Sequence, residues 1–237
     1  MAPPAELPGR APPEPGAIRA PRDLAPLIDH TLLRAGASAA DVDRACDEAL
    51  RLGFAGVCVR GEHVARVAAA LAGSRVLPVA VVDFPLGEGS TGERSREARE
   101  VVRAGAREVD AVVALPALLA LDHRAVLEDL RELVGAAGPA AVKVILETCR
   151  LGPEQKAAGA ALAAAAGAAF VKTSTGFGAG GATEEDVRLL RAAVGRAVGV
   201  KASGGIRTAG DALRMVRAGA SRLGCSASVA IVEAGGF

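Results

Sequence analysis

The sequence predicts a single-domain α/β protein with a (β/α)8 barrel fold, and three observations support this prediction. Eight short apolar runs alternate with helical patterns from Leu27 onward. Corresponding positions in successive runs recur every 22 to 33 residues, the length of one strand with its crossover helix. The runs are almost continuously apolar, as expected of parallel strands that are buried on both faces. The predicted strands are residues 27–33, 56–59, 77–84, 108–115, 141–148, 170–174, 198–203 and 221–226.

Two of the intervening helices have clear start signals and one apolar face each. Ser38 is the predicted N-cap of a helix in residues 38–54, and Thr183 is that of a helix in residues 183–194. The spacing of apolar residues predicts which side chains face the strands. These are Val42, Cys46, Ala49 and Leu50 in the first helix, and Val187, Leu190 and Val194 in the second.

The first 26 residues have a different composition from the rest of the chain. They contain eight of the 13 prolines and no continuous apolar stretch of the kind that a signal peptide requires. We therefore expect a flexible Pro- and Ala-rich tail in residues 1–26 and the barrel in residues 27–237. No apolar run is long enough to cross a membrane.

The composition favours a small-molecule partner. The net charge is +1, and no Lys- or Arg-rich run offers a surface for nucleic acid or an anionic membrane. Aromatic residues make up only 2% of the chain, so there is no platform on which bases could stack.

The cysteines and histidines are too scattered to predict a metal site or a disulfide framework. We expect the cysteines to be buried thiols in a reducing cytoplasm, and we expect no metal. The residues concerned are Cys46, Cys58, Cys149 and Cys225, with His30, His63 and His123.

The lysines carry the clearest chemical signal in the sequence. Only four occur among 28 basic residues, and Lys143, Lys172 and Lys201 lie in predicted strands at intervals of 29 residues. Equal spacing over successive strand–helix units places these amines at similar heights in a barrel. Unlike arginine, a desolvated or crowded lysine can lose its proton and act as a Schiff-base nucleophile. Asp110, in another predicted strand, either neutralises a lysine or moves protons, and the two roles are compatible.

The loops after the last two predicted strands have the composition of an anion site. In barrels, phosphate often binds to backbone N–H groups in these two loops. Glycines allow the backbone to approach the anion closely, and arginine and serine add donors. The candidate residues are Gly204, Gly205, Arg207, Ser226 and Ser228.

A doubly wound sheet is the main alternative fold, because residues 176–181 match G-x-G-x-x-G between a strand and a helix. A dinucleotide site also needs an acidic residue at the end of the next strand. That strand, "VGVKASGG", ends in lysine and small residues, which argues against nucleotide binding.

Four segments together resemble deoxyribose-phosphate aldolases, in order from about Leu27 to Val232: "LIDHTLL", "KVILET", "VKTSTGFGAGGAT" and "VKASGGIRT". The resemblance implies a (β/α)8 barrel that reversibly cleaves 2-deoxy-D-ribose 5-phosphate to D-glyceraldehyde 3-phosphate and acetaldehyde without metal or cofactor. It also implies roles for individual residues. Lys172 matches the Schiff-base lysine, Lys201 the lysine that perturbs it, and Asp110 the acid that moves protons. The phosphate positions are Gly204, Gly205, Arg207, Gly224 and Ser226.

Several positions depart from the pattern of this family and bear on phosphate affinity. They are Arg60-Gly61 in place of Asn-Pro, Asp83 for glycine, Ala114 for asparagine, Ala227 for a second serine, and Phe177 where one branch has lysine. We therefore expect phosphate binding to depend more heavily on Arg207 and backbone donors.

Two alternatives to an aldolase remain open at this stage. A phosphosugar isomerase would need the anion loops but no paired lysines, and a non-catalytic phosphosugar-binding barrel would need neither an imine nor a proton shuttle. The resemblance also implies a homodimer.

Overall fold

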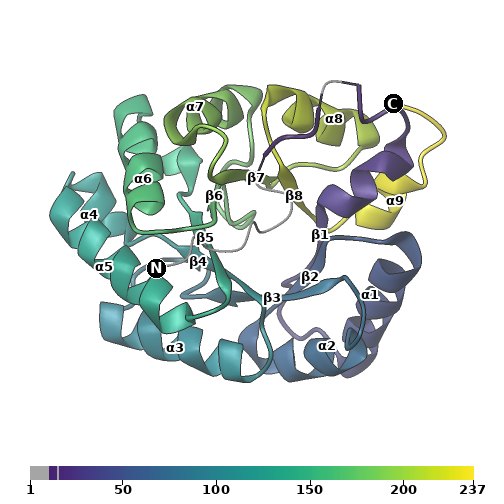
Figure 1. Cartoon of the computed structure of the whole chain (residues 1–237), viewed down its shortest axis with the longest axis horizontal. Coiled ribbons are helices and arrows are strands. Elements are labelled where there is room, and N and C mark those ends of the chain that lie inside the picture. The colour runs from purple at the N-terminus through teal and green to yellow at the C-terminus, as the bar shows by residue number, and fades with distance from the viewer. Residues whose placement is uncertain (1–10, 15) are drawn as a thin grey trace.

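The computed structural model describes residues 11–14 and 16–237, and its core is a closed barrel of eight parallel strands surrounded by helices (Figure 1). Each strand pairs with the next along the chain, and β1 pairs with β8 to close the barrel. The strands are β1 (Ile28–Leu32), β2 (Gly56–Val59), β3 (Leu77–Val82), β4 (Glu108–Val112), β5 (Ala141–Ile145), β6 (Phe170–Lys172), β7 (Gly199–Ser203) and β8 (Arg222–Cys225). The (β/α)8 prediction is confirmed, and the doubly wound alternative is wrong.

Helices follow every strand and form the outer layer. The α-helices are α1 (Ala39–Leu52), α2 (Val64–Ala70), α3 (Thr91–Arg103), α4 (Leu115–Leu119), α5 (His123–Ala137), α6 (Pro153–Ala165), α7 (Glu184–Val194), α8 (Ala209–Ala218) and α9 (Ser228–Val232). Short 3-10 helices are η1 (Pro21–Leu27), η2 (Gly61–His63) and η3 (Thr148–Arg150). The predicted caps are confirmed: Ser38 accepts a hydrogen bond from the backbone of Asp41, and Thr183 accepts one from that of Asp186.

The strands are buried on both faces, and the two faces have different chemistry. Successive side chains on a strand point to opposite faces. In β4, Val109 and Ala111 join the large apolar core between strands and helices, whereas Glu108 and Asp110 make ion pairs in the barrel interior. The same alternation puts Lys201 inside in β7. The interior of the barrel therefore holds an ionic network beside two small apolar clusters, and the large apolar core surrounds it.

Residues 21–26 are not part of a tail, so the predicted boundary is wrong for this segment. They belong to η1, which packs against α8 and α9 at the right of Figure 1. Asp23 stabilises the start of η1 by accepting hydrogen bonds of 2.8 Å from the backbone N–H groups of Arg19 and Ala20. Leu24 is completely buried. Residues 1–10 and 15 of the predicted tail lie outside the described residues.

Two predictions of burial are also wrong. Leu50 in α1 is 41% exposed, because it lies at the edge of the helix face that Val42, Cys46 and Ala49 bury. Cys149 is exposed in the loop after β5, whereas the other three cysteines are buried. All four are free thiols.

Paired leucine substitutions test whether η1 is part of the folded barrel. Leu24→Ala removes a fully buried side chain and should lower the free energy of unfolding by about 2–5 kcal/mol. Leu50→Ala, at an exposed position, should change it by no more than about 0.5 kcal/mol. Urea unfolding of both variants and the parent chain measures the difference. Equal effects of the two substitutions would show that η1 contributes nothing to stability.

Candidate active site

Three lysines and one aspartate lie side by side inside the barrel. Lys172 is the last residue of β6, and its Cα is in register with that of Lys201 in β7. Lys143 in β5 is likewise in register with Asp110 in β4. The 29-residue spacing therefore places Lys172 and Lys201 at adjacent positions, as predicted. For Lys143 the prediction of equal height is wrong, because Lys143 is in register with Phe170 and lies two positions earlier than Lys172.

The Asp110 carboxylate contacts all three amines. Its Oδ1 lies 2.7 Å from Lys143 Nζ, and its Oδ2 lies 2.9 Å from Lys172 Nζ and 2.7 Å from Lys201 Nζ. These four residues are buried. Asp110 is thus the shared acceptor that allows three amines to sit close together away from water.

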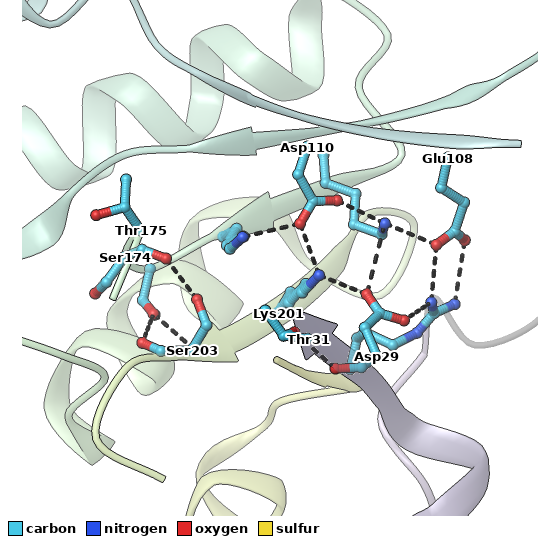
Figure 2. Close-up of polar contacts among 12 residues, drawn as sticks. Asp29, Thr31, Glu108, Asp110, Ser174, Thr175, Lys201 and Ser203 are labelled. Carbon is cyan, nitrogen blue, oxygen red and sulfur yellow. Dashed lines mark hydrogen bonds and ion pairs between the residues drawn. The ribbon is translucent and has the colours of Figure 1, made fainter. Parts of the chain in front are cut away.

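A second set of charged residues continues this network toward the other end of the barrel. Figure 2 shows the contacts running from Asp110 through Lys201 to Asp29, and across to Glu108. Asp29 Oδ2 lies 2.5 Å from Lys201 Nζ, and Glu108 Oε2 lies 2.7 Å from Lys143 Nζ. Arg222 Nη1 donates to both carboxylates, at 2.7 Å to Asp29 and 2.9 Å to Glu108.

These supporting residues were not predicted from the sequence: Asp29, Glu108, Arg222 and the ionic role of Lys143. A signal was present for Asp29 and Lys143, since each is a charged residue in the interior of a predicted apolar strand. The cationic side chains also need space inside the barrel. A Cβ on Gly224 would lie 3.1 Å from Lys201 Cε, so glycine at this position leaves room for the lysine side chain.

The network has one more basic group than it has carboxylates. Three acids, Asp29, Glu108 and Asp110, face the four basic groups of Lys143, Lys172, Lys201 and Arg222. In a buried network an uncompensated charge is costly. Lys172 is the basic group with the least compensation by negative charge, because Asp110 is its one carboxylate partner among the described residues. Charge balance therefore favours a neutral amine at Lys172.

The pKa directions agree with this balance. Burial lowers the pKa of Lys172 below its ordinary value, and the charge of Lys201 lowers it further, against the attraction of Asp110. Burial also acts on Lys201, but the charges of Asp110 and Asp29 overcome it and raise the pKa of Lys201. Burial opposes ionisation of Asp110, yet the three lysines hold the pKa of its carboxyl well below the usual range.

Both causes that the sequence suggested, desolvation and a neighbouring cation, act on the pKa of Lys172. Burial is the larger cause, and Lys201 adds to it.

A pocket of about 380 Å³ opens at the carboxyl ends of the strands, and Lys172 lies in its wall. The five phosphate positions that the family resemblance implied line the same pocket: Gly204, Gly205, Arg207, Gly224 and Ser226. Of the described residues, neither Asp110 nor Lys201 lines it, so these two act from beneath the lysine. Ser228 is buried away from the pocket, and its hydroxyl donates to the Cys225 carbonyl. The volume suits a small ligand.

The glycines after β6 allow the loops that follow β6 and β7 to pack closely together. A Cβ on Gly181 would lie 2.3 Å from the Gly204 carbonyl oxygen, and Ala182 N donates to the carbonyls of Ser203 and Gly204 at 3.0 Å. The G-x-G-x-x-G match thus reflects close backbone packing between the loops after β6 and β7, rather than a nucleotide site.

Glu147 holds the loop that follows Lys172. Its buried carboxylate accepts hydrogen bonds from both the backbone N–H, at 3.3 Å, and the hydroxyl of Thr175. The same hydroxyl accepts from Phe177 N at 3.1 Å. Thr175 and Phe177 both line the pocket, so Glu147 sets the shape of one wall. The sequence analysis missed Thr175 and Glu147 in this role, and it also missed Thr31 and Arg34, which line the wall contributed by β1.

Asp83, one of the departures noted above, stabilises the loop between β3 and α3. Its φ of 49° lies in the left-handed region, where glycine is the usual residue. The Asp83 carboxylate accepts from Gly89 N at 3.2 Å and lies 3.1 Å from Nε of buried Arg94. These contacts compensate for the backbone strain, and Asp83 does not line the pocket. No contact in the structure explains Ala114.

The described residues hold neither a cluster suited to a metal ion nor a membrane-spanning helix. No group of three or more His, Cys, Asp or Glu side chains in this part of the chain could hold a metal ion. Nor is any helix within the described ranges long and apolar enough to cross a membrane.

Comparison with known proteins places the chain in a family. The model of the DeoC/LacD family aldolases matches residues 24–232. Deoxyribose-phosphate aldolase of Alkaliphilus oremlandii is 48% identical over 212 residues, which cover 89% of this chain and 96% of the relative. That of Bacillus cytotoxicus is 50% identical over 211 residues, covering 89% and 95%. The tetrameric deoxyribose-phosphate aldolase of Aeropyrum pernix has a similar structure, with a TM-score of 0.85 at 34% identity over 92% of each chain. The chain belongs to the DeoC/LacD family of aldolases.

Proposed function

We propose that this aldolase reversibly cleaves 2-deoxy-D-ribose 5-phosphate to D-glyceraldehyde 3-phosphate and acetaldehyde through a Schiff base on Lys172. The observation that carries the proposal is a buried amine with a lowered pKa in the wall of a pocket whose other walls are suited to an anion. The relatives that are about half identical to this chain bear the name of this activity.

The chemistry begins with the free amine of Lys172, which attacks C1 of the open-chain sugar. The carbinolamine loses water to give a protonated imine, and this imine accepts the electron pair of the C2–C3 bond as the proton leaves the 3-hydroxyl. Glyceraldehyde 3-phosphate departs, the enamine is protonated at C2, and water releases acetaldehyde and restores the amine.

Asp110 and Lys201 support these proton transfers from below. The ionised carboxylate of Asp110 is a proton acceptor next to Lys172. Lys201, whose pKa is raised, stays protonated and is a proton donor. We infer that protons reach the substrate through water held by this pair. The backbone N–H groups of Gly204 and Gly205, with Arg207 and Ser226, hold the phosphate at the other end of the pocket.

The partners in this proposal are a small phosphorylated sugar and its aldehyde products. A homodimer in the cytoplasm is also part of the proposal. The four unpaired thiols support a reducing compartment, and assembly into a homo-oligomer has a precedent in the tetramer of the Aeropyrum relative.

Covalent trapping tests the role of Lys172. Borohydride with acetaldehyde should leave one reduced two-carbon adduct on the parent chain, and peptide mass spectrometry should place it on Lys172. Lys172→Arg should give no adduct and almost no aldolase activity, because arginine stays protonated. The control is Lys156→Arg, which changes a lysine paired with Asp186 outside the site. A parent enzyme without an adduct would favour an isomerase or a non-catalytic binder, and an active Lys172→Arg enzyme would reject the assignment.

A charge-balance experiment tests why the amine is neutral. Lys143→Met leaves three carboxylates facing three basic groups, so Lys172 should then be held protonated. The acid limb of the profile of kcat/KM against pH should move to higher pH, with about tenfold less activity at neutral pH for each unit moved.

The matched variant restores the excess of one basic group without restoring the lysine. Glu108 lies 2.7 Å from Lys143, so Lys143→Met combined with Glu108→Gln removes one charge of each sign. This double variant should move the acid limb back toward that of the parent enzyme. Identical profiles for the single and double variants would show that net charge in the barrel does not control Lys172. Thermal unfolding of each variant identifies any loss that is due to misfolding.

A further inference from the structure

The charged residues that line the pocket are all basic. They are Lys172, Arg207 and Arg34, and no aspartate or glutamate of the described chain lies among the lining residues. Arg34 follows β1, and Arg207 follows β7. Because β8 lies between these two strands in the closed barrel, the two arginines flank the loop at Gly224–Ser226. An anion bound to this loop would have a guanidinium group on either side.

The backbone at Arg34 is fixed in place. Arg60 Nε donates to the carbonyl of Leu33 at 3.0 Å, and the Leu33 side chain is buried. This contact ties the end of β2 to the loop that carries Arg34. Arg60 is one of the departures from the family pattern, and its side chain thus supports the β1 side of the pocket.

The Arg34 side chain is held less firmly than its backbone. It is 55% exposed and pairs through Nη2 with the Asp41 carboxylate. Asp41 has other partners, since it accepts from the backbone N–H of Ser38 at 2.9 Å, from the Ser38 hydroxyl at 2.7 Å, and from Arg44. Asp41 therefore stays satisfied when Arg34 turns away, and the exposed ion pair that is lost contributes little to stability.

We propose that Arg34 is a specificity-determining residue that exchanges Asp41 for the phosphate of the substrate and, with Arg207, clamps it from both sides. A phosphate monoester carries nearly two negative charges at neutral pH, which two guanidinium groups match. The second arginine also supplies donors on a surface where Ala227 and Phe177 provide no side-chain hydrogen bond. This inference rests on the proposed function, because it assigns one more group to the same substrate.

The test compares two arginines that share one carboxylate. Arg34→Met and Arg44→Met each remove a partner of Asp41, but only Arg34 lines the pocket. The measured quantity is the ratio of kcat/KM for deoxyribose 5-phosphate to that for unphosphorylated deoxyribose. Arg34→Met should lower this ratio about 10- to 100-fold, mainly through KM, because a charge-assisted hydrogen bond is lost. Arg34→Lys should give an intermediate ratio, and Arg44→Met should keep the parent ratio.

A second measurement separates this inference from the proposed function. Calorimetric titration with inorganic phosphate should give a weaker Kd for Arg34→Met than for the parent chain and Arg44→Met. If the parent enzyme cleaves neither sugar, the proposed function fails, and the phosphate titration still decides the role of Arg34. An unchanged ratio and Kd in Arg34→Met, or equal losses in both methionine variants, would overturn the clamp.

Discussion

The contact of one carboxylate with three amines is the interaction on which the rest of the site depends. Asp110 allows Lys143, Lys172 and Lys201 to be buried in one barrel without prohibitive repulsion. Removing one partner from such a buried network typically costs about 3–5 kcal/mol, so the network also constrains the strands that carry it. The same contacts distribute the protons unequally, because Lys201 has two carboxylates within reach and Lys172 has one.

The ionic network and the ligand pocket lie at different depths in the barrel. The lower part, with Glu108, Arg222 and Asp29, pairs charges closely, and none of these three residues lines the pocket. Lys172 lies at the boundary, with its amine between that ionic interior and the pocket. The upper part is made of loops whose glycines allow the backbone to approach closely, as where Gly181 meets Gly204. A single lysine is thereby both desolvated and accessible, which are the two conditions that an imine-forming amine needs.

Much of this could be predicted from the sequence, and the rest depends on contacts that only the closed barrel creates. The spacing of Lys172 and Lys201 indicated their register, whereas Lys143, at the same interval, lies two positions out of register with Lys172. Arg222 and Glu108 are 114 positions apart and each begins its strand, where a charged side chain is more often solvated. Their pairing requires β4 and β8 to face each other across the interior. Composition misassigned residues 21–26, because prolines are typical of tails but also suit the start of a short helix such as η1. Leu50 was misassigned because periodicity locates a helix face only approximately.

Lys172 is the amine that loses its proton while its neighbours keep theirs. The chain has only four lysines, so NMR of protein labelled with ¹⁵N-lysine would give four side-chain signals that single substitutions can assign. In a pH titration, the account predicts that Lys172 Nζ deprotonates below its ordinary pKa of 10.5, while Lys143 and Lys201 stay charged beyond that pH. A Lys172 signal that stays protonated up to pH 10.5, or a Lys201 signal that titrates before it, would contradict the account.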